Sequence, residues 1–164
     1  MTLEPLILKM ISYDHGSPER IQHFLKVHSF AKTIAVSEHL DEKTLFITEA
    51  AAIVHDIGIR LCLEKYGDGN GKLQEKEGPA IAEKLLRKLG FEQEVSERVQ
   101  YLIAHHHTYN NIDGIDYQIL VEADFLVNIM EDGLSKEAAL KSYHNIFKTS
   151  CGKMICREMF DITR

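Results

Sequence analysis

The stretch Glu49-Ala50-Ala51-Ala52-Ile53-Val54-His55-Asp56-Ile57-Gly58 decides how this chain is interpreted. It begins as a strongly apolar, helix-like run and ends in two side chains that can bind a metal ion, His55 and Asp56. An ionised carboxylate at the end of a buried helix needs a cation or several hydrogen-bond donors, because it has lost its contact with water. A bound metal ion would compensate both residues. Further candidate ligands in comparable settings are His23, His105, His106 and Asp124.

The composition is that of an ordinary globular domain. The chain has 164 residues, of which 45% are hydrophobic and 27% charged, so we expect one domain over residues 1–164 with a core of its own. The 19 Lys and Arg against 25 Asp and Glu give a net charge of −6. This balance argues against binding to a nucleic acid polymer, because such binding depends on basic side chains that neutralise phosphates. A small anionic substrate remains compatible with it, through a local cation or a metal ion.

The cysteines and the apolar segments indicate in which cellular compartment the protein is expected. The three cysteines are an odd number without CxxC spacing, which is typical of reduced thiols in a cytoplasmic protein. No segment approaches the ~20 consecutive apolar residues that cross a membrane, so we expect no membrane partner. Residues 3–11 are apolar but contain Glu4 and Pro5, which favours a first helix over a signal sequence. The sequence does not indicate the oligomeric state.

Apolar residues recur at helical spacing along most of the chain, and strand patterns are nearly absent, which predicts an all-α fold. The predicted helices cover residues 3–11, 18–40, 42–56, 79–89, 92–107, 117–131, a segment from 135 onward, and 153–162. Ser17, Asp41 and Asp116 are the expected N-caps, and Gly58 is expected to end its helix in a left-handed conformation. The glycine-rich stretch 66–71 is predicted to be a mobile loop that could cover a site.

Helical phase turns several polar candidates toward the core. His23 and His28 lie on adjacent apolar stripes of one helix, and phase alone does not choose between them. His55 points inward, and Asp56 lies about 100° further round, so both can flank one ion. Asp124 stands in the middle of an apolar helix, where Asp is rarely buried unpaired; an arginine or a backbone amide could also satisfy it. A mixed nitrogen and oxygen set of this kind suits Mn, Fe, Co or Ni better than Zn.

Three motifs bring these residues together. They are Arg20-x-x-His23-x-x-x-Val27-x-x-x-Ala31, then His55-Asp56-Ile57-Gly58, then Ile119-Leu120-Val121-Glu122-Ala123-Asp124. This pattern resembles the HD superfamily of metal-dependent phosphohydrolases. The resemblance covers about residues 18–130 and implies a helical bundle of the HD-domain type, with C-terminal helices over residues 134–162 packed on it.

The resemblance also implies the ligand set. The family's four metal ligands correspond to His23, His55, Asp56 and Asp124 in this chain. His23 is favoured over His28, because an apolar and then a small residue follow the family's first His, at the positions of Val27 and Ala31.

One position suggests a single ion. Members with two metals usually carry a further His where this chain has Gln74, so the resemblance implies one divalent ion per chain. We expect Mn, Fe, Co or Ni, with Mg or Zn as alternatives. His105 and His106 would face the substrate phosphate or a weakly bound second ion. At least one of residues 105–107 is expected only to end a helix.

The implied reaction is hydrolysis of a phosphate ester or anhydride in a small molecule, with a nucleotide as the expected substrate. Asp56 would orient or deprotonate a metal-activated water, and His106 would donate a proton to the leaving oxygen. The expected phosphate-binding residues are Arg20, His105 and Arg60. Lys65 is expected to be a solvated surface charge.

Two other functions stay open at this stage. Di-iron oxygenases use the same scaffold, but they need six ligands, including the His that Gln74 replaces here. A non-catalytic nucleotide-binding module would keep the bundle, although we would then expect a broken ligand set rather than four intact positions.

Overall fold

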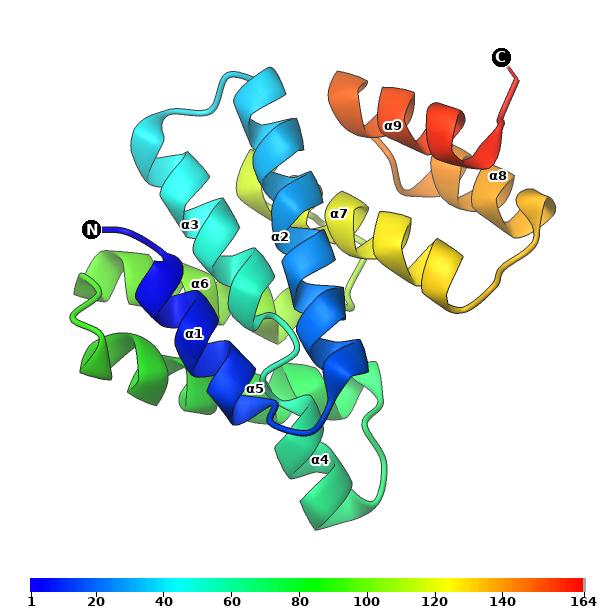
Figure 1. The fold of residues 1–164 in the computed structure, drawn as a ribbon. Coiled ribbons are helices and arrows are strands. Elements are labelled where there is room, and N and C mark those ends of the chain that lie inside the picture. Colours follow the sequence, from blue (N-terminus) through cyan, green and yellow to red (C-terminus); the bar gives the residue numbers. More distant parts are fainter. Residues whose placement is uncertain (164) are drawn as a thin grey trace.

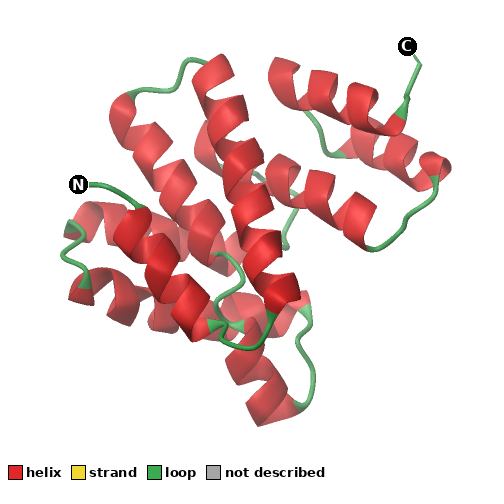
Figure 2. Ribbon diagram, viewed as in Figure 1, coloured by secondary structure: helices red, strands yellow, loops and turns green. Residues whose placement is uncertain are grey.

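The computed structural model describes residues 1–163, which form helices and connecting loops without strands (Figures 1 and 2). The all-α prediction is therefore confirmed. The nine helices of this part of the chain are α1 (Glu4–Tyr13), α2 (Pro18–Ser37), α3 (Glu42–Val54), α4 (Ile59–Tyr66), α5 (Gly71–Lys88), α6 (Gln93–His105), α7 (Ile115–Glu131), α8 (Lys136–Asn145) and α9 (Ser150–Phe160).

Helices α2, α3 and α7 form the centre of the bundle. α2 and α3 run side by side, and α7 packs against both (Figure 1). α6 contacts α3 and carries α5 on its other side, while α1 lies over α3 and α4 packs on α5. The C-terminal pair, α8 and α9, packs against α7 at the opposite end of the molecule from α4.

Side-chain caps fix the start of several helices. Asp41 accepts a hydrogen bond from the backbone N–H of Thr44, as the sequence predicts, and Ser135 accepts one from Ala138. Ser17 stands at the predicted N-cap of α2, but its side chain makes no capping bond. The prediction for Asp116 is wrong: α7 begins at Ile115, after Gly114, and the Asp116 carboxylate binds the Arg98 guanidinium instead.

The segment between α3 and α6 differs most from the prediction. Gly58 has a φ of −75° rather than a left-handed conformation, and α4, which was not predicted, begins directly after it. α5 begins at Gly71, capped by the side chain of Asn70, and Pro79 lies inside this helix rather than at its start. The glycine-rich loop is therefore short, and the side chain of Asp68 accepts two hydrogen bonds from Asn70.

A single buried apolar cluster joins the helices of residues 1–163. Ala50, Ala51 and Ala52 of α3 are completely buried, which lets α2, α6 and α7 approach this helix closely. α7 is buried along most of its length, as its nearly continuous apolar sequence predicts. None of the described helices is long and apolar enough to cross a membrane.

Candidate metal centre

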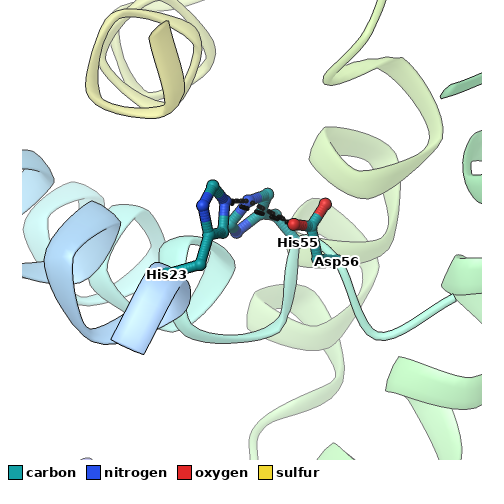
Figure 3. Close-up of side chains that lie close together, drawn as sticks. All are labelled: His23, His55 and Asp56. Carbon is teal, nitrogen blue, oxygen red and sulfur yellow. Dashed lines mark hydrogen bonds and ion pairs between the residues drawn. The ribbon is translucent and has the colours of Figure 1, made fainter. Parts of the chain in front are cut away.

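Three helices of the central layer bring the predicted ligands together. His23 lies on the buried face of α2, His55 ends α3, Asp56 follows it in the turn, and Asp124 comes from α7. Figure 3 shows that the side chains of His23, His55 and Asp56 converge on one point between their elements. α2, α3 and α7 pack on each other through apolar residues, and this packing fixes where the four polar side chains meet.

Five of the six distances among the four donor atoms are short and similar, whereas the two carboxylates lie farther from each other, since only His23, His55 and Asp56 have donor atoms that all lie within 4.8 Å of one another. His23 Nε2 lies 3.2 Å from His55 Nε2, from Asp56 Oδ2 and from Asp124 Oδ1. His55 Nε2 lies 3.4 Å from the same two carboxylate oxygens. Donors placed about 2.1 Å from an ion and at right angles to each other are about 3 Å apart, so this spacing is that of ligands around one ion.

Outer hydrogen bonds fix which nitrogen of each imidazole faces the centre. His55 Nδ1 donates to the backbone carbonyl of Ala52 at 2.8 Å, and His23 Nδ1 donates to the carboxylate of Glu131 at 3.0 Å. Both Nε2 lone pairs therefore point toward each other and toward two carboxylate oxygens. Four electron-rich atoms in a buried place need a cation or protons between them. The donor set thus fits a divalent metal ion, and the Nδ1 bonds are those that usually orient metal-binding histidines.

In the absence of an ion, protons take its place. Burial alone would lower the pKa of His23, but hydrogen bonds to Asp124 and Asp56 outweigh it and raise this pKa to about 10. Burial would also lower the pKa of His55, yet the nearby charge of Asp56 and the bonds to both carboxylates raise it well above the ordinary value. The pKa values of Asp56 and Asp124 are lowered by the same contacts, despite their burial. Metal ions and protons would therefore compete for this site.

The end of α6 repeats the geometry of the end of α3. His106 Nδ1 donates to the carbonyl of Ile103 at 2.7 Å, which again leaves Nε2 facing inward. This Nε2 is buried, has no hydrogen-bond partner among the described residues, and lies 3.5 Å from Asp56 Oδ1. Asp56, His106 and His107 form a second group whose donor atoms are close enough for an ion.

Gln74 fixes the orientation of His107. The Gln74 side-chain amide donates to the carbonyl of Gly69 at 2.6 Å, so its oxygen faces His107 Nε2 at 3.1 Å and must accept a hydrogen bond from it. The other ring nitrogen, Nδ1, lies 3.4 Å from the Tyr109 hydroxyl. Burial and the neighbouring His106 lower the pKa of His107 to about 4, so its ring is neutral at physiological pH.

Two other histidines lie away from this cluster. His105, expected to bind substrate, stacks on the Tyr101 ring at a centroid distance of 4.2 Å, and its Nδ1 donates to the Tyr101 carbonyl. The structure thus places His106 and His107, and not His105, beside Asp56. His28 binds Glu49 at 2.9 Å, so His23 is the histidine of α2 that reaches the centre.

The expected cationic residues have different surroundings. Arg20 lies one turn before His23, and its Nε lies 3.2 Å from the buried carboxylate of Asp14, an ion pair in which this Nε makes no hydrogen bond. Arg60 is exposed and donates to the carbonyl of Tyr13 at the end of α1, so its guanidinium holds α4 to α1. Lys65 is exposed and binds Glu77, in agreement with its prediction as surface charge.

The sequence analysis did not identify two supporting residues on α7. Asn128 donates to Asp124 Oδ1 at 2.9 Å, and Glu131 binds both His23 and Lys26. These residues follow Asp124 by four and seven positions, which is the spacing of one helix face. That spacing is the signal by which they could have been found.

A comparison with protein families identifies the family of this chain. The model of the HD domain matches residues 20–142, three quarters of the chain. The chain belongs to the HD domain family. Members of the HD superfamily are usually metal-dependent phosphohydrolases.

This HD domain also has a similar solved structure. A crystal structure described as a predicted HD superfamily hydrolase from an uncultured Thermotogales bacterium superposes with a TM-score of 0.71, over 97% of this chain and 86% of that one. The sequences are 24% identical, so this likeness concerns the fold. No match was found among the curated proteins.

The HD domain exposes its donor cluster on one side. The side chain of His55 is fully buried and that of Asp124 is 5% exposed, whereas the Asp56 side chain is 21% exposed. Solvent therefore contacts the cluster at Asp56, where His106 and His107 also lie.

Proposed function

We propose that this HD domain is a metal-dependent hydrolase that cleaves a phosphate ester or anhydride in a small molecule, with a nucleotide as the favoured substrate. The observation that carries the proposal is that the Nε2 atoms of His23 and His55 lie 3.2 to 3.4 Å from carboxylate oxygens of Asp56 and Asp124, with both histidines oriented by bonds at Nδ1. Family membership supports the same chemistry.

His23, His55, Asp56 and Asp124 would hold one divalent ion, with Mn, Fe, Co or Ni favoured and Mg or Zn as alternatives. Such an ion lowers the pKa of a bound water toward neutrality and draws charge from a phosphoryl oxygen. The Asp56 carboxylate faces two ways, because Oδ2 lies at His23 and His55 while Oδ1 faces His106. Its second oxygen can orient the attacking water and accept its proton.

The groups around Asp56 provide the remaining roles. His106 lies next to Asp56 and, when protonated on Nε2, can donate this proton to the leaving oxygen. Arg20 is the proposed phosphate ligand, because it lies one turn before His23 on α2 and its ion pair with Asp14 restrains the guanidinium. Arg60 and His105 have no part in the proposal, because their side chains serve other contacts.

Substitution of two ligands tests the proposal directly. Hydrolysis of a panel of phosphate esters and anhydrides would be measured with added Mn²⁺ for wild type, His55→Ala and Asp124→Ala. We expect a loss of activity of at least about a hundredfold, and a matching loss of bound metal, in both variants. His28→Ala is the matched control from α2 and should keep both the activity and the bound metal. Undiminished hydrolysis in either ligand variant contradicts the assignment.

One observation favours a second candidate, an HD-type di-iron oxygenase: Asp56, His106 and His107 could hold another ion. Gln74 argues against this candidate, because its side-chain oxygen accepts a hydrogen bond from the Nε2–H of His107. Metal analysis of protein purified without chelator decides between them, since about two irons per chain would favour the oxygenase. Tight nucleotide binding without turnover under any divalent metal would instead indicate a non-catalytic binding module.

A further inference from the structure

Two aromatic rings from different elements meet beside the donor cluster. Tyr109 belongs to the loop that follows α6, and Phe125 is the residue after the ligand Asp124 on α7. Their centroids are 5.0 Å apart and their planes cross at 75°, an edge-to-face arrangement. Tyr109 is 43% exposed, and Phe125 is partly exposed. The pair therefore offers aromatic surface to a ligand.

Contacts on the Tyr109 side connect this pair to the accessible side of the site. The Tyr109 hydroxyl lies 3.4 Å from His107 Nδ1, and His107 belongs to the group that includes Asp56 and His106. A phosphate that reaches the cluster past Asp56 thus has the Tyr109 and Phe125 rings next to it. The remainder of the same molecule would lie against these rings.

The Tyr109 ring is held in place by the residues that precede it. The carboxylate of Glu75 accepts hydrogen bonds from the backbone N–H of His107 at 3.0 Å and from the Thr108 hydroxyl at 2.8 Å. The hydroxyl of Tyr117 donates to the Thr108 carbonyl. Because both residues before Tyr109 are fixed, a ligand would not have to order this part of the loop, which reduces the entropic cost of binding.

We propose that the exposed ring of Tyr109, braced edge-to-face by Phe125, forms a stacking surface for the planar base of a nucleotide, and so makes this site prefer nucleotides over aliphatic phosphates. The inference rests on the proposed function, since it assumes that the phosphate lies at the ion. Aromatic side chains stack on any base without reading its hydrogen-bonding edge, so the preference among the bases is small. The ring of Tyr109 carries the interaction, because its hydroxyl is engaged by His107.

The test compares one substrate that has a base with one that lacks it. KM and kcat would be measured for a nucleoside monophosphate and for ribose 5-phosphate with Mn²⁺-loaded wild type, Tyr109→Leu and Phe125→Leu. We expect Tyr109→Leu to raise KM for the nucleotide about tenfold or more, with kcat within about twofold and KM for ribose 5-phosphate unchanged. Phe125→Leu removes only the ring that braces Tyr109, so it should raise KM for the nucleotide less than Tyr109→Leu does. Tyr109→Phe keeps the ring and should behave as wild type.

Tyr66→Leu is a matched control, because Tyr66 is an exposed tyrosine at the end of α4 that binds Glu77. Thermal unfolding of each variant shows whether it folds. If the variants change KM for both substrates equally, or for neither, the stacking surface is wrong while the hydrolase proposal stands.

If wild type hydrolyses neither of these two compounds, the panel of phosphate esters and anhydrides tests the hydrolase proposal separately, and calorimetric binding of both compounds to the Mn²⁺-loaded protein decides the stacking surface. A nucleotide affinity that is about tenfold weaker in Tyr109→Leu than in Tyr109→Phe then supports it. Equal affinities, or no binding, overturn it.

Discussion

At the residue scale, the position of each imidazole is set by what its Nδ1 contacts. His55 binds a backbone carbonyl of its own helix, an acceptor that no substitution removes. His23 depends instead on the Glu131 side chain, at 3.0 Å, which Lys26 holds from the other side at 2.7 Å. The two proposed ligands therefore differ in how vulnerable their orientation is to mutation.

Glu131→Ala should weaken metal binding without removing a ligand. Loss of the carboxylate frees the His23 ring to rotate and makes Nε2 a weaker donor, so we expect the Mn²⁺ dissociation constant to rise about 10- to 100-fold. Calorimetric titration of the metal-free protein measures it. Glu131→Gln keeps an acceptor without the charge, so its dissociation constant should lie between those of wild type and Glu131→Ala. Glu137→Ala, at an exposed position on α8, is the control. An unchanged dissociation constant in Glu131→Ala would show that packing alone orients His23.

Helical phase could predict the inward direction of His23, His55 and Asp124, because each lies on or at the end of a regular helix with an apolar stripe. It could not rank the three histidines of residues 105–107. α6 ends at His105, and beyond that residue the turn rather than the helix period decides where a side chain points. As a result, His107 lies beside Asp56, where His105 was predicted.

At the element scale, glycines permit the close contacts that position the site. A Cβ atom on Gly58 would lie 3.1 Å from the Gly78 backbone, and one on Gly78 would lie 2.8 Å from Ile103, so the glycines let the turn after Asp56, α5 and α6 approach one another closely. The sequence shows these glycines but not their partner. Pro79 also suggested a helix start, whereas the Asn70 cap nine residues earlier is the actual one. Tertiary packing thus overrides a local signal here.

Gly152 plays the same role where α9 meets α7. A Cβ atom there would overlap the buried carboxylate of Glu122, which cannot move aside because it accepts backbone hydrogen bonds from Lys148 and Thr149. We expect Gly152→Ala to lower the free energy of unfolding by about 2–3 kcal/mol, as overpacking does. Urea denaturation measures this change. In Gly69→Ala the added atom would meet only ordinary contacts at 3.6 Å or more, so a similar loss in that control would contradict the explanation.

At the scale of the whole molecule, the donor cluster joins three helices whose contributing residues are far apart in the sequence. His23, His55 and Asp124 come from α2, α3 and α7, the layer that forms the centre of the fold. The periodicity predicted the helices that carry these residues, but the way in which they pack depends on contacts between distant residues, which a single sequence does not display. An ion in this cluster would connect the same three helices, so metal binding and global stability should be linked.

This linkage has a defined pH dependence. In the metal-free protein the pKa of His23 is about 10, against an ordinary value of 6.5, so the folded state holds a proton that the unfolded state releases between these values. The resulting stabilisation is complete below pH 6.5, falls as the pH rises, and is absent above pH 10. A bound ion replaces this proton, so the affinity of the site for the ion increases as the pH rises over the same range.

The Tm of the Mn²⁺-loaded protein and that of the metal-free protein should therefore diverge as the pH rises. At about a hundred times its dissociation constant an ion adds about 2.7 kcal/mol of stability, which corresponds to about 5–10 °C in Tm for a chain of this size. We expect the gap in Tm between metal-loaded and metal-free protein to widen from pH 6 to pH 9, because the metal-free form loses the proton-dependent contribution while the loaded form does not. Asp124→Ala should show no gap at any pH. A gap that narrows toward pH 9 in wild type would mean that protons and the ion do not compete for His23.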